Sequence, residues 1–239
     1  TGTAPDVWYG EAGRAFEWRH AGFTEDLGAR VERDLSLEEY FMLDAARNPA
    51  TGDWTGVPSD FQITSLFYNT EHLASAGLPF PDDSWDTAAL VDAARKLTRK
   101  DGDTALRWGF NLQPEYITAG WMLWIKLLGG EVLDSTRTES RLSESGAVDA
   151  LRAMGEMIHE TGITPSPSDE AFPAWAAVWG FQQGTTSMML NIYSWNKYLR
   201  DHGMDEYGVS VVPAAGDGRR VTTAVPNVWV VNADSPKER

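Results

Sequence analysis

The sequence predicts an α/β protein with mainly parallel sheets covered by helices, and three observations support this fold class. Stretches typical of strands alternate with stretches typical of helices along the 239 residues. The strand-like stretch 56–70 is rich in aromatic and β-branched residues. The helix-like stretch 85–100 places Leu90, Ala94 and Leu97 on one apolar stripe that can pack on a sheet.

The first half of the chain gives local signals for four further boundaries. A short apolar run closes at Gly10, which indicates a buried strand that ends in a loop. Asn69 can cap a helix, Gly77 suits the left-handed backbone at that helix's end, and Ser84 can cap the next helix. The expected elements are a strand at 7–10, a mixed helical and irregular stretch at 11–27, a strand at 56–70, and helices at 70–77 and 85–100.

The second half alternates in the same way. Gly129 and Gly162 end two expected helices, and Ser145 can cap the second of them. The strand at 221–235 is apolar throughout, so we expect its Trp229 to be buried. The expected elements are strands at 107–112 and 131–134, strands that begin the stretches 185–195 and 207–218, a closing strand within 221–239, and helices ending at 129, 162 and 184.

Composition excludes several classes of function. The formal charge of −15 argues against a sequence-independent grip on nucleic acid or on an anionic membrane, because both need a concentrated basic face. Zero cysteines exclude disulfides, thiolate metal sites and a cysteine nucleophile. No run of 18 apolar residues exists, and the first residues lack the pattern of an export signal. The 11 tryptophans indicate flat apolar surfaces as well as core.

Sequence motifs for catalysis are weak. The four histidines are dispersed and none has the spacing of a zinc site, so neither a metal nor a cofactor is expected. Ser194 and Lys197 spell SxxK without its companion motifs, a match that chance explains. A carboxylate pair such as Glu11 with Asp60 or Glu115 keeps a glycan-processing hydrolase open as an alternative, because sequence gives no distance.

Four separated stretches together resemble a known family. They are residues 56–70, 85–98, 109–134, and 181–195 followed by 207–218, in the order and spacing found in extracellular solute-binding proteins of sugar-importing ABC transporters. Within that group the chain is similar to the maltodextrin-binding and glycerol-phosphate-binding branch, from Pro5 to Pro236. The resemblance implies a non-enzymatic protein that holds a carbohydrate, expected to be an oligosaccharide, and delivers it to an ABC permease. Binding of a non-sugar solute is the other alternative.

The resemblance also implies an architecture. Family members have two α/β lobes joined by hinge strands, with ligand held in the cleft between them. The crossings near 59–63 and 222–225 place residues 1–61 with 223–239 in one lobe and 62–222 in the other. Because the family begins before this chain and continues past it, we expect a partial chain with an incomplete first lobe. An extracytoplasmic location, a monomeric state and a lipid anchor upstream of residue 1 are further expectations.

Sugar recognition needs hydrogen-bonding side chains beside flat rings, and this defines the expected ligand-binding residues. By resemblance, Tyr116 and Trp195 match stacking positions of the maltodextrin-binding branch, Gln62 replaces a glutamate of its crossing strand, and Glu115 neighbours Tyr116. Asp60 and Asn227 are expected on geometric grounds, because each lies at the mouth of a crossing strand. The full expected set is Tyr9, Glu11, Arg14, Asp60, Gln62, Glu115, Tyr116, Trp121, Trp195 and Asn227.

Overall fold

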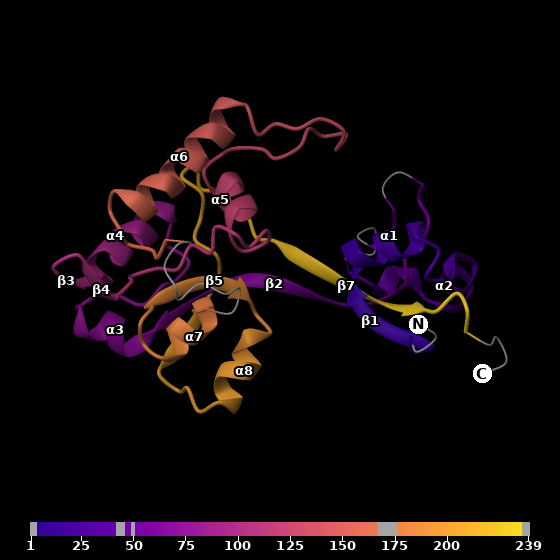
Figure 1. Ribbon diagram of the computed structural model, residues 1–239, viewed down its shortest axis with the longest axis horizontal. Helices are drawn as coiled ribbons and strands as arrows, with labels where there is room; N and C mark the ends of the chain where they lie inside the picture. The colour runs from indigo at the N-terminus through magenta and orange to yellow at the C-terminus, as the bar shows by residue number, and fades with distance from the viewer. Residues whose placement is uncertain (1–3, 42–45, 49–50, 167–175, 236–239) are drawn as a thin grey trace. The chain divides into compact units, whose positions relative to one another are not determined.

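The computed structural model describes residues 4–41, 46–48, 51–166 and 176–235, which form two compact units (Figure 1). Unit 1 comprises Thr1–Gln62 and Ala224–Arg239, and unit 2 comprises Ile63–Thr223. Each boundary falls one residue later than the sequence suggested. The chain therefore passes between the units twice, once within a long strand and once just before the last strand.

Unit 1 is built on a sheet with the strand order β1, β7, β2. Strands β1 and β7 pair antiparallel from Val7 opposite Val231 to Glu11 opposite Asn227. The elements of unit 1 are β1 Val7–Glu11, α1 Ala12–His20, α2 Gly28–Asp34, the 3-10 helix η1 Leu37–Glu39, the first part of β2 Val57–Asn69, and β7 Ala224–Val231.

The core of unit 1 lies on one face of β7. Val228 and Val230 are fully buried there against Ala12 and Ala15 of α1 and Val31 of α2. Successive strand side chains point to opposite faces, so Trp229 lies on the other face and is 45% exposed. The expected burial of Trp229 is therefore wrong, because apolar composition alone does not show which face of a strand is covered.

Unit 2 surrounds the second part of β2, which pairs antiparallel with both β5 and β6. Its elements are α3 Thr70–Ser75, α4 Thr87–Leu97, β3 Arg99–Asp101, β4 Thr104–Arg107, α5 Trp121–Leu127, α6 Ser145–His159, α7 Ala176–Gln182, β5 Met188–Ile192, α8 Trp195–Asp201 and β6 Tyr207–Ser210.

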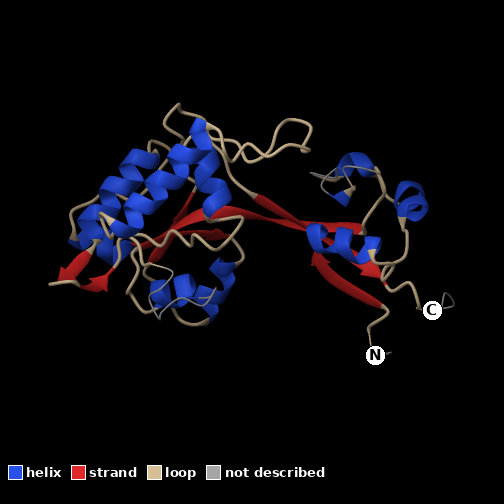
Figure 2. Ribbon diagram, turned by 45° about the horizontal axis from the view of Figure 1, so that its top comes forward, coloured by secondary structure: helices blue, strands red, loops and turns tan. Residues whose placement is uncertain are grey.

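Alternation along the strands of unit 2 produces two cores. Leu66 and Leu190 face one side of the sheet and pack with residues of α4, α5 and α6. Phe67 and Met189, one position along, face the other side and pack with residues of α7 and α8. Helices thus cover both faces of this sheet (Figures 1 and 2), as the α/β prediction requires.

The prediction of mainly parallel sheets is wrong. The ladders β1–β7, β2–β5, β2–β6 and β3–β4 are all antiparallel. Parallel pairing occurs at isolated bridges, of Asp86 with Ala214 and, inside the stretch expected as a strand at 107–112, of Trp108 with Thr186 and of Asn111 with Met189. Likewise, the strand expected at 131–134 is reduced to one bridge, between Leu133 and Ser140.

Local signals at helix ends are partly confirmed. The side chain of Asn69 accepts a hydrogen bond from the backbone N–H of His72 at 2.8 Å, and Gly77 has φ of +67°. The cap of α4 is Asp86, whose carboxylate accepts from Ala89 N–H, and not the expected Ser84. Ser84 instead belongs to a turn around Asp82.

Four threonines of unit 2 join the two chain crossings to a nearby loop. The backbone N–H of Thr64 donates to the carbonyl of Thr223 at 3.0 Å, and their hydroxyls lie 2.7 Å apart. The hydroxyl of Thr222 donates to the carbonyl of Thr64 at 2.8 Å. The hydroxyl of Thr223 donates to the carbonyl of Thr118 at 2.9 Å. These bonds define the threonine latch.

Candidate ligand-binding site

Three strands of unit 1 bring Tyr9, Asp60 and Asn227 into one polar network. The phenolic hydroxyl of Tyr9 lies 3.0 Å and 2.9 Å from the two carboxylate oxygens of Asp60. The amide of Asn227 donates to Asp60 Oδ1 at 2.8 Å, and the hydroxyl of Ser59 donates to Oδ2 at 3.2 Å. Three residues that the sequence singled out separately therefore meet at one carboxylate.

The electrostatics of this network follow from Tyr9. Burial raises its pKa to about 12, with the hydrogen bond and the charge of Asp60 acting in the same direction. Hydrogen bonds from Gln62 and Asn227 to the phenolic oxygen lower the pKa and offset part of this rise. Tyr9 is therefore a neutral donor near pH 7, and Gln62 belongs to the same network.

A cavity of about 440 Å³ lies beside the network. Asp60 and Asn227 form part of its wall, and Phe41 and Phe61 face it with ring centroids 5.2 Å apart. The lining residues of the cavity are Glu39, Tyr40, Phe41, Ala46, Pro58, Ser59, Asp60, Phe61, Pro226 and Asn227.

The two phenylalanines are absent from the set expected from sequence. Phe61 shares a parity with Phe67 in β2, and that pattern favours a core position for both. Phe67 is fully buried, whereas Phe61 is 39% exposed. The available signal was its position between two polar residues at a chain crossing, Asp60 and Gln62.

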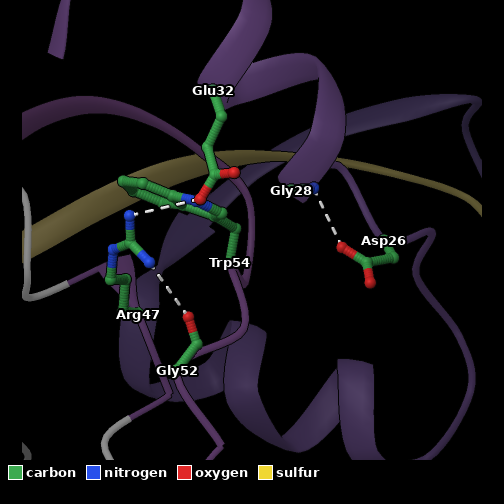
Figure 3. A network of polar contacts seen from close by, with 6 residues as sticks. All are labelled: Asp26, Gly28, Glu32, Arg47, Gly52 and Trp54. Atoms are coloured by element: carbon green, nitrogen blue, oxygen red, sulfur yellow. Dashed lines mark hydrogen bonds and ion pairs between the residues drawn. The ribbon is translucent and has the colours of Figure 1, made fainter.

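Glu32, Arg47, Gly52 and Trp54 form a polar clamp (Figure 3), next to Ala46 in the cavity wall. The guanidinium of Arg47 lies 4.1 Å from the centroid of the Trp54 ring and donates to the carbonyl of Gly52. The indole N–H of Trp54 donates to Glu32 on α2 at 3.3 Å. The backbone N–H and the hydroxyl of Thr55 both donate to the carbonyl of Ala46, at 3.0 Å and 2.9 Å. These two bonds hold the cavity wall at Ala46 in place.

Glu11 and Arg14 lie at the end of β1 and on α1. The backbone of Glu11 is opposite Asn227 in the β1–β7 ladder, so its side chain starts from a position next to the network. Arg14 is exposed and forms an ion pair with Glu17 one helical turn away, at 3.1 Å.

In unit 2, Glu115 and Tyr116 lie on a loop fixed by Gln113. Gln113 is 2% exposed, has φ of +49°, and donates from its side chain to the carbonyl of Leu190 in β5 at 2.7 Å. The loop closes through backbone bonds from Tyr116 to Gln113 and from Gly120 to Tyr116, each 2.9 Å. Burial raises the pKa of Glu115.

The remaining expected residues, Trp121 and Trp195, each begin a helix. Trp121 is the first residue of α5 and packs against buried residues of α5 and α6. Trp195 is the first residue of α8, packs on the core under α7 and α8, and meets the ring of Tyr198 edge-on at 5.2 Å. Both are partly buried, which leaves part of each ring accessible.

The whole chain, residues 1–239, matches the family of bacterial extracellular solute-binding proteins and belongs to it. The extracellular character of this family agrees with the extracytoplasmic location expected from the sequence. Within the described residues, helices are too short or too polar to cross a membrane.

Two solved structures and one curated protein are similar to this chain. Maltose-bound MalE3 of T. maritima is 25% identical with a TM-score of 0.79, covering 99% of this chain and 59% of that one. An ABC substrate-binding protein of Listeria monocytogenes in complex with cycloalternan is 21% identical with a TM-score of 0.81 and equal coverage. A protein of Brucella abortus (strain 2308) named as a binding protein is 28% identical over 189 residues, 77% of this chain. The chain spans 44% of the length of that curated relative.

Proposed function

We propose that this protein binds a carbohydrate, an oligosaccharide in the first instance, and delivers it to an ABC import permease outside the cytoplasmic membrane. The observation that carries the proposal is the match of the whole chain to the solute-binding family, together with the maltose-bound relative at 25% identity. Units 1 and 2 correspond, in this proposal, to the two lobes of the family. That ligand is held between the lobes stays a prediction.

Side chains of each unit support recognition of a sugar. Hydroxyl groups both donate and accept hydrogen bonds, and one face of a sugar ring is made of C–H groups. In unit 1, Asp60, Asn227 and Gln62 supply hydrogen-bond acceptors and donors. In unit 2, Glu115 supplies a hydrogen-bonding carboxyl group and the neighbouring Tyr116 supplies a flat ring. The other predicted contacts, Tyr9, Glu11, Arg14, Trp121 and Trp195, are included in the proposal.

The first experiment is a binding screen on the full chain. Thermal shift and titration calorimetry with mono- and oligosaccharides should find at least one that raises the melting temperature, because a ligand that binds only the folded state stabilises it. Product analysis of the same mixtures should show unaltered sugar. A panel in which no carbohydrate stabilises the protein contradicts the substrate class, and hydrolysis contradicts the assignment as a binding protein.

The second experiment addresses stacking in unit 2. Replacing Trp195 by alanine should reduce the binding free energy of the tightest-binding sugar of the screen by about 1–3 kcal/mol if the ring contacts that sugar. Trp179→Ala is the matched control, since Trp179 is a 47% exposed tryptophan of the same unit that was not assigned to the site. Equal affinities of the two variants and the parent protein would remove Trp195 from the site.

A further inference from the structure

We propose that the cavity of unit 1 is a subsite for one uncharged sugar ring, with Phe41 and Phe61 as its stacking platform and Asp60 and Asn227 as its hydroxyl contacts. The same cavity excludes anionic sugars such as uronic acids and sugar phosphates. This inference rests on the proposed carbohydrate-binding function and adds a location and a charge preference to it.

The aromatic pair is exposed to solvent. Phe41 is 74% exposed and Phe61 is 39% exposed, although their centroids lie only 5.2 Å apart. Their planes are inclined by 46°, so the pair forms a tilted surface and not a closed stack. Both rings line the same cavity. Such flat apolar surfaces match the C–H face of a sugar ring and gain stability when a ligand covers them.

The polar side of the cavity is preorganised. Asp60 is oriented by donors from Tyr9, Ser59 and Asn227, and an ionised carboxylate has about four acceptor positions. Three donors leave acceptor capacity for a ligand hydroxyl. Asn227 is only 3% exposed, and its side-chain amide N–H donates to Asp60. Because these groups are ordered before binding, a sugar hydroxyl that reaches Asp60 meets little ordering cost.

The charge of the cavity is one-sided. Its described lining includes the acidic residues Glu39 and Asp60 and no arginine, lysine or histidine. Arg47, which follows the lining residue Ala46, has its guanidinium paired with Glu32 and hydrogen-bonded to the carbonyl of Gly52. The faces of aromatic rings also carry negative potential. A ligand carboxylate or phosphate would therefore meet like charge without a compensating cation, whereas hydroxyls are accepted.

The dimensions agree with a small ligand portion. The cavity of about 440 Å³ is at the lower end of the range of roughly 300–1,000 Å³ typical of ligand pockets. Its wall at Ala46 is fixed by two bonds from Thr55 and by the Arg47–Trp54 clamp. A fixed wall limits what the cavity admits, so size and charge act together as a filter.

The test of the platform uses the full chain, with maltotriose and cellotriose as probes in titration calorimetry. Phe61→Ala and Phe41→Ala should each lower the affinity for the trisaccharide that the parent protein binds by tenfold or more. Phe61→Leu should lower the affinity by nearly the same factor, because leucine keeps the apolar bulk of the side chain but has no flat ring. Phe23→Ala is the matched control, since Phe23 is 62% exposed in unit 1 and does not line the cavity; its affinity should equal that of the parent protein.

The test of charge selection uses the same trisaccharides with their C6 hydroxymethyl groups oxidised to carboxylates. The parent protein should bind the neutral form at least tenfold more tightly than the oxidised form. Asp60→Asn retains the shape of the side chain and removes its charge, so this ratio should fall severalfold. Melting temperatures and near-ultraviolet circular dichroism confirm that each variant is folded.

The outcomes separate the subsite from the proposed function. If a trisaccharide binds and the Phe41 and Phe61 variants bind it as the parent does, the platform is overturned while carbohydrate binding stands. If the oxidised sugars bind as tightly as the neutral ones, the charge filter is overturned. If neither these probes nor any sugar of the wider screen binds, the proposed function itself fails.

Discussion

The candidate residues of unit 1 and those of unit 2 are held in place in different ways. In unit 1, Tyr9, Asp60 and Asn227 come from three strands and are joined side chain to side chain. In unit 2, Glu115 and Tyr116 occupy one loop whose shape depends on backbone bonds and on the buried Gln113. A side-chain substitution in unit 1 therefore removes one contact, whereas a change at the loop's anchors in unit 2 displaces the whole loop.

The largest effect is expected from Gly120→Ala in the loop of unit 2. A Cβ atom at Gly120 would lie 2.0 Å from the carbonyl oxygen of Gln113 and 2.2 Å from that of Tyr116, so the backbone must move. We expect a loss of about 3 kcal/mol in the free energy of unfolding, measured by urea denaturation. Gly155→Ala, which meets open space in α6, is the control and should stabilise by about 0.5–1 kcal/mol. Equal changes in the free energy of unfolding of the two variants would show that stability does not depend on the close backbone contacts at Gly120.

Gln113→Met should have the next largest effect. Methionine keeps the length of the side chain but cannot donate to the carbonyl of Leu190, and Gln113 is 2% exposed. The free energy of unfolding should fall by about 2 kcal/mol, since a buried acceptor loses its side-chain donor. Gln183→Met, at an exposed position, should change stability by only a few tenths of a kcal/mol. A similar small change in both would show that the loop does not depend on Gln113.

Tyr9→Phe should cost less, about 1 kcal/mol near pH 7, because it removes one hydrogen-bond donor from Asp60. Its pH dependence is a second readout. The folded pKa of Tyr9 is raised to about 12 from 10.0, so the unfolded chain loses this proton first. The resulting stabilisation is complete below pH 10 and is lost as pH rises towards 12.

Denaturation midpoints of the parent protein and Tyr9→Phe, measured from pH 8 to pH 12, test this. The difference between the two proteins should narrow above pH 10. A constant difference over that interval would mean that Tyr9 titrates alike in the folded and unfolded chains. Tyr193→Phe, at a 48% exposed tyrosine of unit 2, controls for removal of a hydroxyl.

The smallest effect is expected for Arg14→Ala. Both partners of its ion pair with Glu17 have side chains 66% exposed, and such i,i+3 pairs contribute about 0.2–0.5 kcal/mol. Any loss should vanish at high salt, because exposed charges are screened. A loss above 1 kcal/mol that persists in salt would show that Arg14 has a structural role beyond this pair.

Periodicity and turn chemistry predicted much of this fold. The strand expected at 56–70 is β2, and the cap at Asn69 is present, because both depend on neighbouring residues. Strand direction was not predictable in the same way. It depends on which distant segments pair, and the stretch at 107–112 forms bridges and not a ladder.

The candidate site was also predictable only in part, because some of its features depend on contacts between distant segments. Asp60 and Asn227 could be selected because each lies at a strand mouth, but their shared contact with Tyr9 depends on the register of β1 and β7. Phe41 belongs to no periodic pattern, so its pairing with Phe61 could not be predicted from the sequence. Apolar side chains at functional surfaces look like core residues until their exposure is known.

The threonine latch has a mechanical consequence for the two polypeptide connections. Thr64 and Thr223 are bonded to each other through both backbone and hydroxyl groups, so the two connections are joined on the unit 2 side. The hydroxyl of Thr223 also donates to the carbonyl of Thr118, so the same bonds tie both connections to the loop that bears Tyr116.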